Sequence, residues 1–349
     1  MGWGVAASPG MTTTPGPATE RLWRMASLVP LPEEAVRGFV PDLPVEIVVA
    51  EPRTPAGVRA AVADADIVLG DFTGVVGIDA SVLAAGQRIA FVQQCSVGVE
   101  HIDLAACSAA GIPVANTAGA NAVAVAEWCV MGAIAALRSA VWADAQMRLG
   151  GWPQMEMVER GCVDLAQRRV GIVGFGPIGL ACARRFAAMD CSVSYWSRHR
   201  RPDGATAGAA YVDLDDLVRT SDVLVVVIAR AAETLGILGA ERLALLPRGA
   251  VIVNAARGGL VDEIAMVRML DDGHLAAVAL DVYDVEPPPT DDPLRSHEKV
   301  LLSPHISGGT LQSRIRILGQ VSANLRRAVT GEPVQDVVNG VDPVVRRHA

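Results

Sequence analysis

The chain has 349 residues, which is more than one ordinary domain holds and predicts two domains of roughly 150 residues each. Hydrophobic residues make up 51% of it and charged residues 19%, which excludes a wholly disordered chain, and the low aromatic share of 4% predicts cores built mainly from small aliphatic side chains. The formal net charge of −8 argues against a general nucleic-acid binder or a binder of anionic membranes.

The first part of the chain predicts a parallel sheet covered by helices. Residues 1–19, rich in Gly, Thr, Pro and Ala, lack periodicity and the order of a signal peptide, so we expect a flexible leader. From Arg24 onward, short β-rich runs alternate with helical patterns. The predicted strands are 25–29, 45–49, 66–69, 88–93 and 112–115, and the predicted helices are 32–39, 55–62 and 102–110.

A long apolar run from Ala122 to about Ala140 raises the question of a membrane span. Glu127 interrupts the run early and Arg138 ends it. Because a carboxylate within lipid costs several kcal/mol, we interpret the run as a long buried helix, and we expect no membrane partner and a cytoplasmic protein.

A second alternating series begins at Arg169, after a glycine-rich break at 150–153. Six strands joined by helices match a complete dinucleotide-binding sheet. The predicted strands are 170–173, 192–196, 223–228, 250–254, 276–281 and 300–303. A final helical segment, 311–329, is expected to return to the first domain. The fold class is therefore α/β, with two Rossmann-like domains: a flavodoxin-like substrate domain (20–118 and 311–349) and an inserted cofactor domain (119–310) that includes the long helix.

A glycine-rich turn directly follows the first strand of the second series. It contains Gly174, Phe175, Gly176, Pro177, Ile178 and Gly179, and a helical pattern continues from it to Met189. Between a strand and a helix, these glycines permit a tight turn and a close backbone approach to a pyrophosphate at the helix N-terminus. The alternative is a glycine turn that serves packing only.

The next strand ends without the carboxylate that commonly binds the adenosine ribose of NAD. Ser197, Arg198, His199, Arg200 and Arg201 stand there instead. A small hydroxyl followed by guanidinium groups suits a 2′-phosphate, so the sequence predicts a preference for NADP(H), with NAD(H) as a second choice. The alternative is that these arginines form a solvated loop.

Three polar segments follow later strands and supply Arg257, Glu286 and His305. Because the carboxyl ends of parallel strands meet at the ligand crevice, we expect these residues to lie near a nicotinamide. A histidine can deliver a proton at neutral pH, a carboxylate can orient it, and an arginine can bind a carboxylate and polarise a ketone. Taken singly, each residue has an ordinary alternative: His305 as a turn residue, Glu286 as a loop charge and Arg257 as a helix-capping cation.

The six cysteines are dispersed and form no C-x-x-C pair. We therefore predict reduced core cysteines in a cytosolic protein, with neither a metal site nor a dithiol redox site.

From about Leu28 to about Val338 the chain resembles the D-isomer-specific 2-hydroxyacid dehydrogenases. The resemblance implies that His305 is the general acid/base, Glu286 its partner, and Arg257 the residue that binds substrate. It also implies that Val97, Gly98, Val99 and Asn121 lie at the substrate and that Ala256, Asp281 and Gly308 belong to the cofactor site, with Asp281 at the nicotinamide. The signatures are 96–103, 111–116, 125–127, 174–179, 254–261, 281–287 and Pro304-His305.

The resemblance further implies an oxidoreductase that forms homodimers and acts on a small 2-keto or 2-hydroxy acid. Ser197-Arg198 is similar to the NADPH-preferring glyoxylate and hydroxypyruvate reductase branch. Residues 229–234 depart from the family's proline-containing turn, and residues 93–97 contain no Lys or Arg, which disfavours a phosphorylated substrate. The alternatives are an NAD-dependent phosphoglycerate dehydrogenase, a formate- or phosphite-oxidising member, and a corepressor-like protein that binds the nucleotide as a conformational ligand.

Overall fold

The structure is a computed structural model that describes residues 21–202 and 204–347, so the predicted leader at 1–19 lies outside the described residues. The chain divides into two compact units. One contains the described residues up to Gln93, together with Asp103–Val114 and the part from Leu325 onward; the other contains Gln94–Ile102 and Ala115–Asn324. Loop 94–102 therefore groups with the second unit.

The first unit is built on a five-stranded sheet with the order β2-β1-β3-β4-β5. Strand β1 pairs in parallel with both β2 and β3, and the order is that of flavodoxin-like sheets. The strands are β1 (Trp23–Ser27), β2 (Val45–Val49), β3 (Ile67–Gly70), β4 (Phe91–Gln94) and β5 (Val114–Ala115). β1 begins two residues before its predicted start, and β2 matches its predicted range.

Helices α1 (Glu33–Arg37), α2 (Pro55–Val62), α3 (Ala80–Ala85) and α4 (Leu104–Ala109) connect these strands. The sequence analysis missed α3, although Asp79 gives its start: the carboxylate accepts hydrogen bonds from the N–H groups of Ser81 and Val82. The C-terminal helix α13 (Leu311–Thr330) contributes residues to both units.

The second unit is built on a seven-stranded sheet with the order β12-β11-β10-β9-β6-β7-β8. The strands are β6 (Arg169–Val173), β7 (Ser192–Trp196), β8 (Ala210–Tyr211), β9 (Val223–Val226), β10 (Ala250–Asn254), β11 (Leu275–Leu280) and β12 (Val300–Leu302). The prediction of six strands was wrong by one, because β8 has only two residues and leaves no periodic signal. All the pairings described are parallel, so the prediction of parallel-sheet α/β domains is confirmed.

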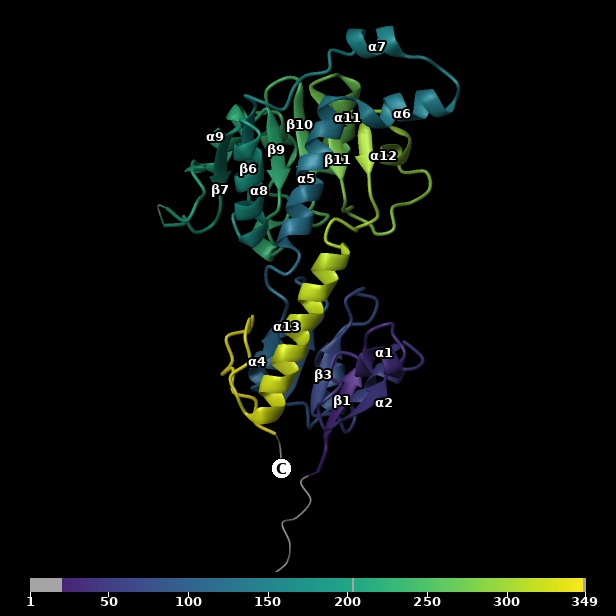
Figure 1. The fold of residues 1–349 in the computed structure, drawn as a ribbon, viewed down its shortest axis with the longest axis vertical. Helices are drawn as coiled ribbons and strands as arrows, with labels where there is room; N and C mark the ends of the chain where they lie inside the picture. The colour runs from purple at the N-terminus through teal and green to yellow at the C-terminus, as the bar shows by residue number, and fades with distance from the viewer. Residues whose placement is uncertain (1–20, 203, 348–349) are drawn as a thin grey trace, which may run out of the picture. The chain divides into compact units, whose positions relative to one another are not determined.

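Helices cover both faces of this sheet (Figure 1). One core packs α5 (Ala122–Leu137) and α8 (Pro177–Ala188) against alternate strand residues such as Val251 and Val253. The other core packs α9 (Leu214–Thr220), α10 (Ala240–Leu243) and α11 (Glu263–Asp271) against the intervening residues, such as Ile252. Burial on both faces explains why the strands are continuously apolar. The short segments η1 (Ala232–Thr234) and α12 (Pro293–Ser296) complete the unit.

The predicted long helix is interrupted earlier than expected. α5 ends at Leu137, Ser139 has a φ of 47°, and α6 (Ala140–Arg148) continues at 68° to α5. Nine of the sixteen α5 residues are buried. Among the described residues, no single helix is long and apolar enough to cross a membrane; α5 and α6 pass that test only as a bent pair.

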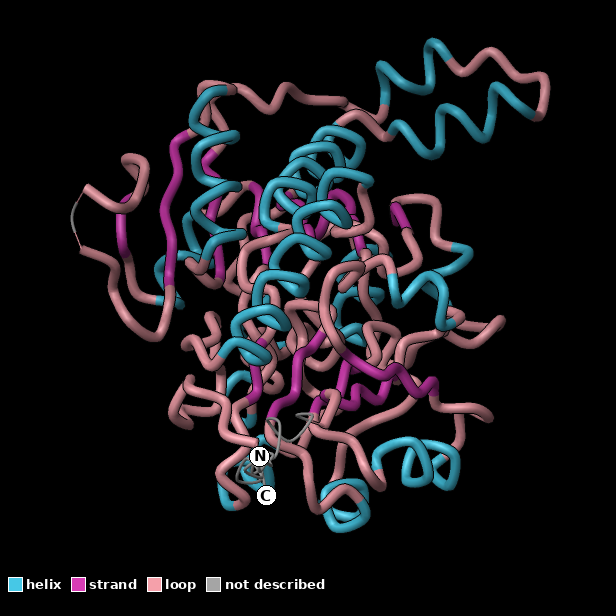
Figure 2. The backbone as a smooth tube through the Cα atoms, turned by 60° about the horizontal axis from the view of Figure 1, so that its bottom comes forward, coloured by secondary structure: helices cyan, strands magenta, loops and turns pink. Residues whose placement is uncertain are grey.

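Residues 140–161, here called the arm, project from the sheet as a helical hairpin of α6 and α7 (Gln154–Glu159) (Figure 2). The guanidinium of Arg160 lies 3.7 Å from the ring centre of Trp142 and 2.9 Å from the carboxylate of Glu298, which holds the hairpin. The arm nevertheless exposes six large apolar side chains: Val141, Met147, Leu149, Trp152, Met155 and Val158.

All six cysteines are free thiols. The prediction of core positions holds for four of them and was wrong for Cys162 and Cys191, which are partly exposed. Cys191 lies at the turn before β7, where its Sγ donates to the Leu165 carbonyl.

Candidate functional site

The carboxyl ends of the seven-stranded sheet bring the predicted site residues to one edge. The chain runs outward from β6 to β7 and β8 and then returns to β9 on the other side of β6, so the strand order reverses between β6 and β9. Ligands bind at such a point in open α/β sheets. The loops after β6, β7, β9, β10, β11 and β12 all begin at this edge.

The turn between β6 and α8 requires glycine at two positions. Gly174 has a φ of +96°, and a Cβ there would lie 2.5 Å from the Cα of Ile228. A Cβ at Gly179 would overlap the Gly174 carbonyl oxygen. Gly176, by contrast, faces open space at the start of the twelve-residue helix α8. The free backbone N–H groups of the first helical turn therefore face an open cradle, which fits a pyrophosphate.

The loop after β7 carries the basic residues predicted to select the cofactor. Ser197 Oγ donates to the His199 carbonyl at 2.7 Å and fixes a turn. Arg198 is half exposed, with its Nη1 3.8 Å from a carboxylate oxygen of Glu233. Arg200 lies 5.9 Å from the ring centre of Tyr211. Glu233, in the loop after β9, thus helps to orient Arg198.

Arg201, the last residue of the basic cluster predicted from the sequence, connects this loop to the glycine turn. Its Nε donates to the Phe175 carbonyl at 3.0 Å, and its backbone N–H donates to the Tyr195 hydroxyl at 3.1 Å. The rings of Phe175 and Tyr195 stack with centres 3.8 Å apart. The two loops expected to hold the nucleotide are thus held together, and no sequence pattern indicates this contact.

His305 and Glu286 form the predicted pair. His305 Nδ1 lies 2.7 Å from Glu286 Oε2, and the Tyr283 N–H donates to Glu286 Oε1 at 3.1 Å. Burial raises the pKa of Glu286, but the hydrogen bonds from His305 and Tyr283 and the charge of Arg257 outweigh it, so the net pKa is lowered. Glu286 therefore stays ionised beside the imidazole, and His305 Nε2 remains free to serve as a proton donor.

Asp281 holds the turn that presents His305. Its buried carboxylate accepts hydrogen bonds from the Ser303 hydroxyl and from the N–H groups of Ile306 and Ser307, the latter two at 2.8 Å. His305 has a φ of 52°, a conformation that costs energy and needs such support. The contact of Asp281 with a nicotinamide stays a prediction beside this positioning role.

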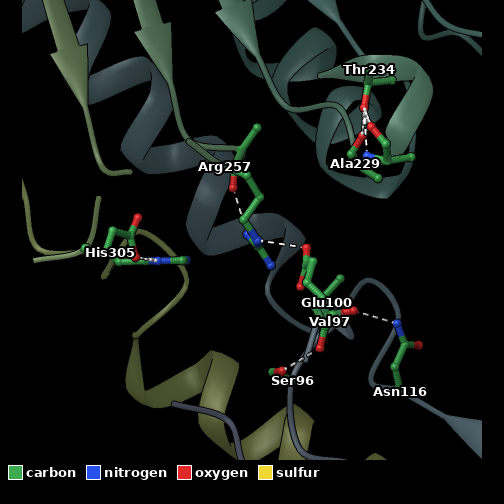
Figure 3. A network of polar contacts seen from close by, with 12 residues as sticks. Ser96, Val97, Glu100, Asn116, Ala229, Thr234, Arg257 and His305 are labelled. Carbon is green, nitrogen blue, oxygen red and sulfur yellow. Dashed lines mark hydrogen bonds and ion pairs between the residues drawn. The ribbon is translucent and has the colours of Figure 1, made fainter. Parts of the chain in front are cut away.

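Arg257 is held over the loop 96–99 (Figure 3). Its Nε donates to Glu100 Oε1 at 2.9 Å and its Nη1 to the Ala256 carbonyl at 2.7 Å. Its Nη2 lies so close to Gly98 that a Cβ at that position would overlap it. Glu100 was not singled out from the sequence as a partner of Arg257, because 157 positions separate the two residues.

The loop 97–99 presents backbone donors beside this guanidinium. Its carbonyls are used: the Val97 carbonyl accepts from Asn116 Nδ2 at 2.7 Å, and the Gly98 carbonyl accepts from Ser96 Oγ at 3.0 Å. Within residues 21–202 and 204–347, no acceptor faces the N–H groups of Val97, Gly98 or Val99. Three free N–H groups next to an arginine suit a carboxylate.

Asn121 and Gly308 lie together at the same edge. A Cβ at Gly308 would be 2.9 Å from Asn121 Nδ2, so only glycine permits this approach. Asn121 Oδ1 is buried and has no hydrogen-bond partner in the described part of the chain. A buried polar atom left in this state is expected to meet a ligand, which supports the assignment of Asn121 to the site.

Residues 229–234, which lack the family's proline, form a turn closed by Thr234. Its hydroxyl donates to the Ala229 carbonyl at 2.9 Å and accepts from the Ala231 N–H at 2.8 Å (Figure 3). A side-chain hydrogen bond thus gives the rigidity that a proline ring gives elsewhere.

A cavity of about 460 Å³ opens against the His305–Glu286 pair. Glu286 and His305 line it together with apolar side chains such as Pro287 and Leu302, and with the charged Arg295. The pair is therefore accessible to a small molecule.

The carboxylates of Glu263 and Asp284 each accept a backbone hydrogen bond, and the sequence did not predict these contacts. Glu263 Oε1 accepts from the Asp284 N–H at 2.8 Å, and Asp284 Oδ1 accepts from the Gly259 N–H at 2.6 Å. Burial raises the pKa of Glu263 to about 7, with further increases from the charges of Asp284, Asp292 and Glu286.

This raised pKa predicts a pH-dependent stability difference between the wild type and Glu263→Gln. The Glu263 pKa is about 7 in the folded state and 4.5 ordinarily, so its stabilising contribution is full below about pH 4.5 and is lost as the pH rises through 7. The free energy of unfolding of the wild type minus that of the variant should therefore fall between about pH 5 and pH 8. Urea unfolding of both proteins measures this difference, and a constant value across that range would contradict the prediction.

The described residues contain no group of three or more His, Cys, Asp or Glu side chains suited to a metal ion.

Comparison with known proteins gives consistent relatives. The family model for the D-isomer specific 2-hydroxyacid dehydrogenase NAD binding domain matches residues 130–307. A glyoxylate reductase of Thermofilum pendens is 35% identical over 266 residues, which are 75% of this chain and 78% of the relative. A D-3-phosphoglycerate dehydrogenase of Mycobacterium leprae is 35% identical over 281 residues, which are 80% of this chain and 52% of the relative.

Solved structures agree with these sequence relatives. A putative D-isomer specific 2-hydroxyacid dehydrogenase from Polaromonas is 27% identical with a TM-score of 0.79, covering 91% of this chain and all of that one. The chain spans about half the length of the phosphoglycerate dehydrogenases it matches.

Proposed function

Because the chain belongs to the D-isomer specific 2-hydroxyacid dehydrogenase family, we propose that it reduces a small 2-keto acid to the D-2-hydroxy acid with a nicotinamide cofactor. This family consists of oxidoreductases, as the sequence analysis predicts. The observation that carries the proposal is the His305–Glu286 pair, 2.7 Å apart, at the same sheet edge as Arg257.

The residues present fit this reaction. A reduced nicotinamide, when bound, would supply the hydride for this reduction. His305, protonated and held through Nδ1 by Glu286, gives a proton from Nε2 to the carbonyl oxygen, so the keto group becomes a hydroxyl. Arg257 Nη2 polarises that oxygen, and the free N–H groups of residues 97–99 bind the substrate carboxylate. We assign the glycine turn 174–179 and the loop 197–201 to the nucleotide.

A small, unphosphorylated substrate such as glyoxylate or hydroxypyruvate fits better than phosphoglycerate. The loop 93–97 has no Lys or Arg, and the carboxylate of Glu100 stands beside Arg257, where it repels a second anionic group. The relatives include both glyoxylate reductases and phosphoglycerate dehydrogenases. The lack of Lys or Arg in the loop 93–97 and the negative charge of Glu100 favour a substrate of the glyoxylate reductase type.

A steady-state panel tests the proposal. Glyoxylate, hydroxypyruvate, pyruvate, a bulkier keto acid and 3-phosphohydroxypyruvate are each assayed with NADPH and NADH, and formate and phosphite with NAD⁺ and NADP⁺. Highest kcat/KM for a small unphosphorylated keto acid is the expected result. Preference for 3-phosphohydroxypyruvate would instead indicate a phosphoglycerate dehydrogenase. Oxidation of formate or phosphite would indicate a formate- or phosphite-oxidising member of the family. Tight nucleotide binding without any turnover points to a corepressor-like binding protein.

The proposed preference for NADPH rests on Ser197 and Arg198. Arg198→Ala should raise the KM and the Kd for NADPH by ~10-fold or more, because a charge-assisted hydrogen bond to the 2′-phosphate is lost, and change those for NADH less than about twofold. Fluorescence titration and steady-state kinetics with both cofactors measure this. Arg219→Ala, which removes an exposed arginine paired with Asp216, is the control. A wild-type preference for NADH would overturn the assignment.

We also propose that the protein is a homodimer built through the cofactor-binding unit. The six exposed apolar side chains of the arm support this, since apolar side chains gathered on one projecting segment favour burial at an interface. Analytical ultracentrifugation of the wild type and of Trp152→Glu tests it: a dimer that the substitution weakens is expected, and a monomeric wild type overturns it. The free thiols support our further proposal of a reducing, cytoplasmic location.

The division of the chain supports a proposed division of labour. We assign substrate binding to the discontinuous domain 20–118 and 311–349 and cofactor binding to 119–310. By compactness, three segments of the proposed substrate domain group instead with the second unit: 94–102, 115–118 and 311–324. The first of them brings Gly98 to Arg257.

A further inference from the structure

The reaction proposed above needs Arg257 and the His305–Glu286 pair at a fixed separation, yet these residues stand on different loops. Arg257 follows β10, and Glu286 follows β11. The two loops touch through their backbones, because a Cβ at Gly258 would overlap the Tyr283 carbonyl oxygen. One side chain adds to this contact: Asp284 Oδ1 accepts the Gly259 N–H at 2.6 Å.

Asp284 is itself held from a third element. Glu263, in the first turn of α11, accepts the Asp284 N–H at 2.8 Å. Asp284 is therefore held by two hydrogen bonds: its backbone N–H donates to Glu263, and its carboxylate accepts from the Gly259 N–H. The start of α11 is in turn fixed by Asp262, whose side chain accepts the Ala265 N–H at 2.9 Å. Through these bonds a rigid helix end determines where both loops lie.

We propose that Glu263 is a positioning residue of the reaction: through Asp284 it sets the distance between Arg257 and the His305–Glu286 pair. The inference rests on the proposed function for its chemistry. It assigns no substrate contact to Glu263, because the side chain acts through the backbone of Asp284.

Burial, and after it the charges of its neighbours, favour the neutral form of Glu263. The groups that face it are the carboxylates of Asp284, Asp292 and Glu286 on the following loop, and Asp262 adjoins it on its own helix. With a pKa of about 7, Glu263 is partly protonated at neutral pH. Both forms keep an oxygen that accepts the Asp284 N–H, and the neutral form adds no further negative charge beside Glu286.

Two substitutions separate positioning from mere structure. Glu263→Ala removes the acceptor and should lower kcat by about 10- to 100-fold through misplacement of the catalytic groups, with the Kd for the nucleotide changed less than about twofold. Glu263→Gln keeps an oxygen for the Asp284 N–H and should restore kcat to within about threefold of the wild type. Glu241→Ala, an exposed glutamate in the first turn of α10, is the matched control and should change neither quantity.

Hydrogen–deuterium exchange gives a readout that does not depend on turnover. Exchange of the segments 257–260 and 282–287 should rise about tenfold or more in Glu263→Ala, which corresponds to at least one lost local hydrogen bond, and stay near the wild-type rate in Glu263→Gln. If Glu263→Ala fails to fold, Asp284→Ala, which removes the acceptor of the Gly259 N–H, should give the same loss of kcat and the same faster exchange.

The outcomes distinguish this inference from the proposed function. Unchanged kcat and exchange in Glu263→Ala, or failure of Glu263→Gln to restore them, overturns the positioning role. A wild type that turns over no 2-keto acid overturns the proposed function, and the exchange rates then decide the role of Glu263 in holding the loops.

Discussion

Replacing His305 with alanine is expected to lower kcat/KM for reduction of the best keto acid by about three orders of magnitude, within the usual range for loss of a general acid. The imidazole is held through Nδ1 by the ionised Glu286, which leaves Nε2 as the donor in the proposed reaction. Alanine removes this donor and leaves the glycine turn 174–179 unchanged. Steady-state kinetics measure the loss, and fluorescence titration should show the Kd for the nucleotide within about twofold of the wild type.

The control for this variant is another histidine of the same unit. His274, before β11, bonds to the Leu246 carbonyl through Nε2 at 2.9 Å, at the opposite ends of the strands from the site. His274→Gln keeps a group that can form this bond and should leave kcat/KM within about twofold. Turnover close to that of the wild type by His305→Ala, across the whole panel of keto acids, would show that another group supplies the proton.

The contact between His305 and Glu286 and the position of the glycine turn could be predicted because both depend on strand ends. Val170–Val173 is a continuous apolar run that ends at Gly174, and Ala276–Leu280 is another that ends at Asp281, shortly before Glu286. Once the strands are known to be parallel, the rule that their carboxyl ends share one edge brings His305 and Glu286 together. Local apolar pattern and topology therefore suffice for this part of the site.

The contacts that orient these residues could not be predicted in the same way. Glu100 lies 157 positions from Arg257, and their ion pair depends on the conformation of two loops without periodicity. Arg201 reaches Phe175 across 26 positions, and Glu263 reaches Asp284 across 21. In each case the sequence shows an ordinary charged residue near a loop, and only the folded loop identifies its partner.

The same reasoning explains the errors in the fold. β8 has two residues, so its pairing with β7 comes from the tertiary structure and not from a pattern of its own. The apolar run from Ala122 predicted one helix to about Ala140, but α5 ends at Leu137 and Ser139 adopts a φ of 47°. Apolar composition alone does not reveal a single residue with a left-handed conformation.

Replacing Arg257 with lysine should lower kcat/KM by about 100-fold or more, with a large share of the loss in the KM of the keto acid. The guanidinium uses Nε for Glu100 and Nη1 for Ala256, which leaves Nη2 for the substrate beside Gly98. The ammonium of lysine keeps the positive charge but lacks the planar set of donors. It therefore cannot bond to both Glu100 and Ala256 and still present a fixed third donor to the substrate. The expected fall in kcat/KM therefore reports the geometry of the donors and not their charge. Steady-state kinetics with the best keto acid measure it.

Glu100→Gln provides the comparison that assigns this loss to orientation. The amide oxygen still accepts from Arg257 Nε, so the guanidinium stays in place while the negative charge beside the substrate site is removed. We expect the KM for a small keto acid to fall or stay within about twofold, and that for 3-phosphohydroxypyruvate to fall further, because like-charge repulsion no longer opposes the phosphate. Two results would contradict the role given to the guanidinium. Wild-type kinetics in Arg257→Lys would show that the planar set of donors is not needed. A loss in Glu100→Gln equal to that in Arg257→Lys would show that the essential group is the negative charge of Glu100.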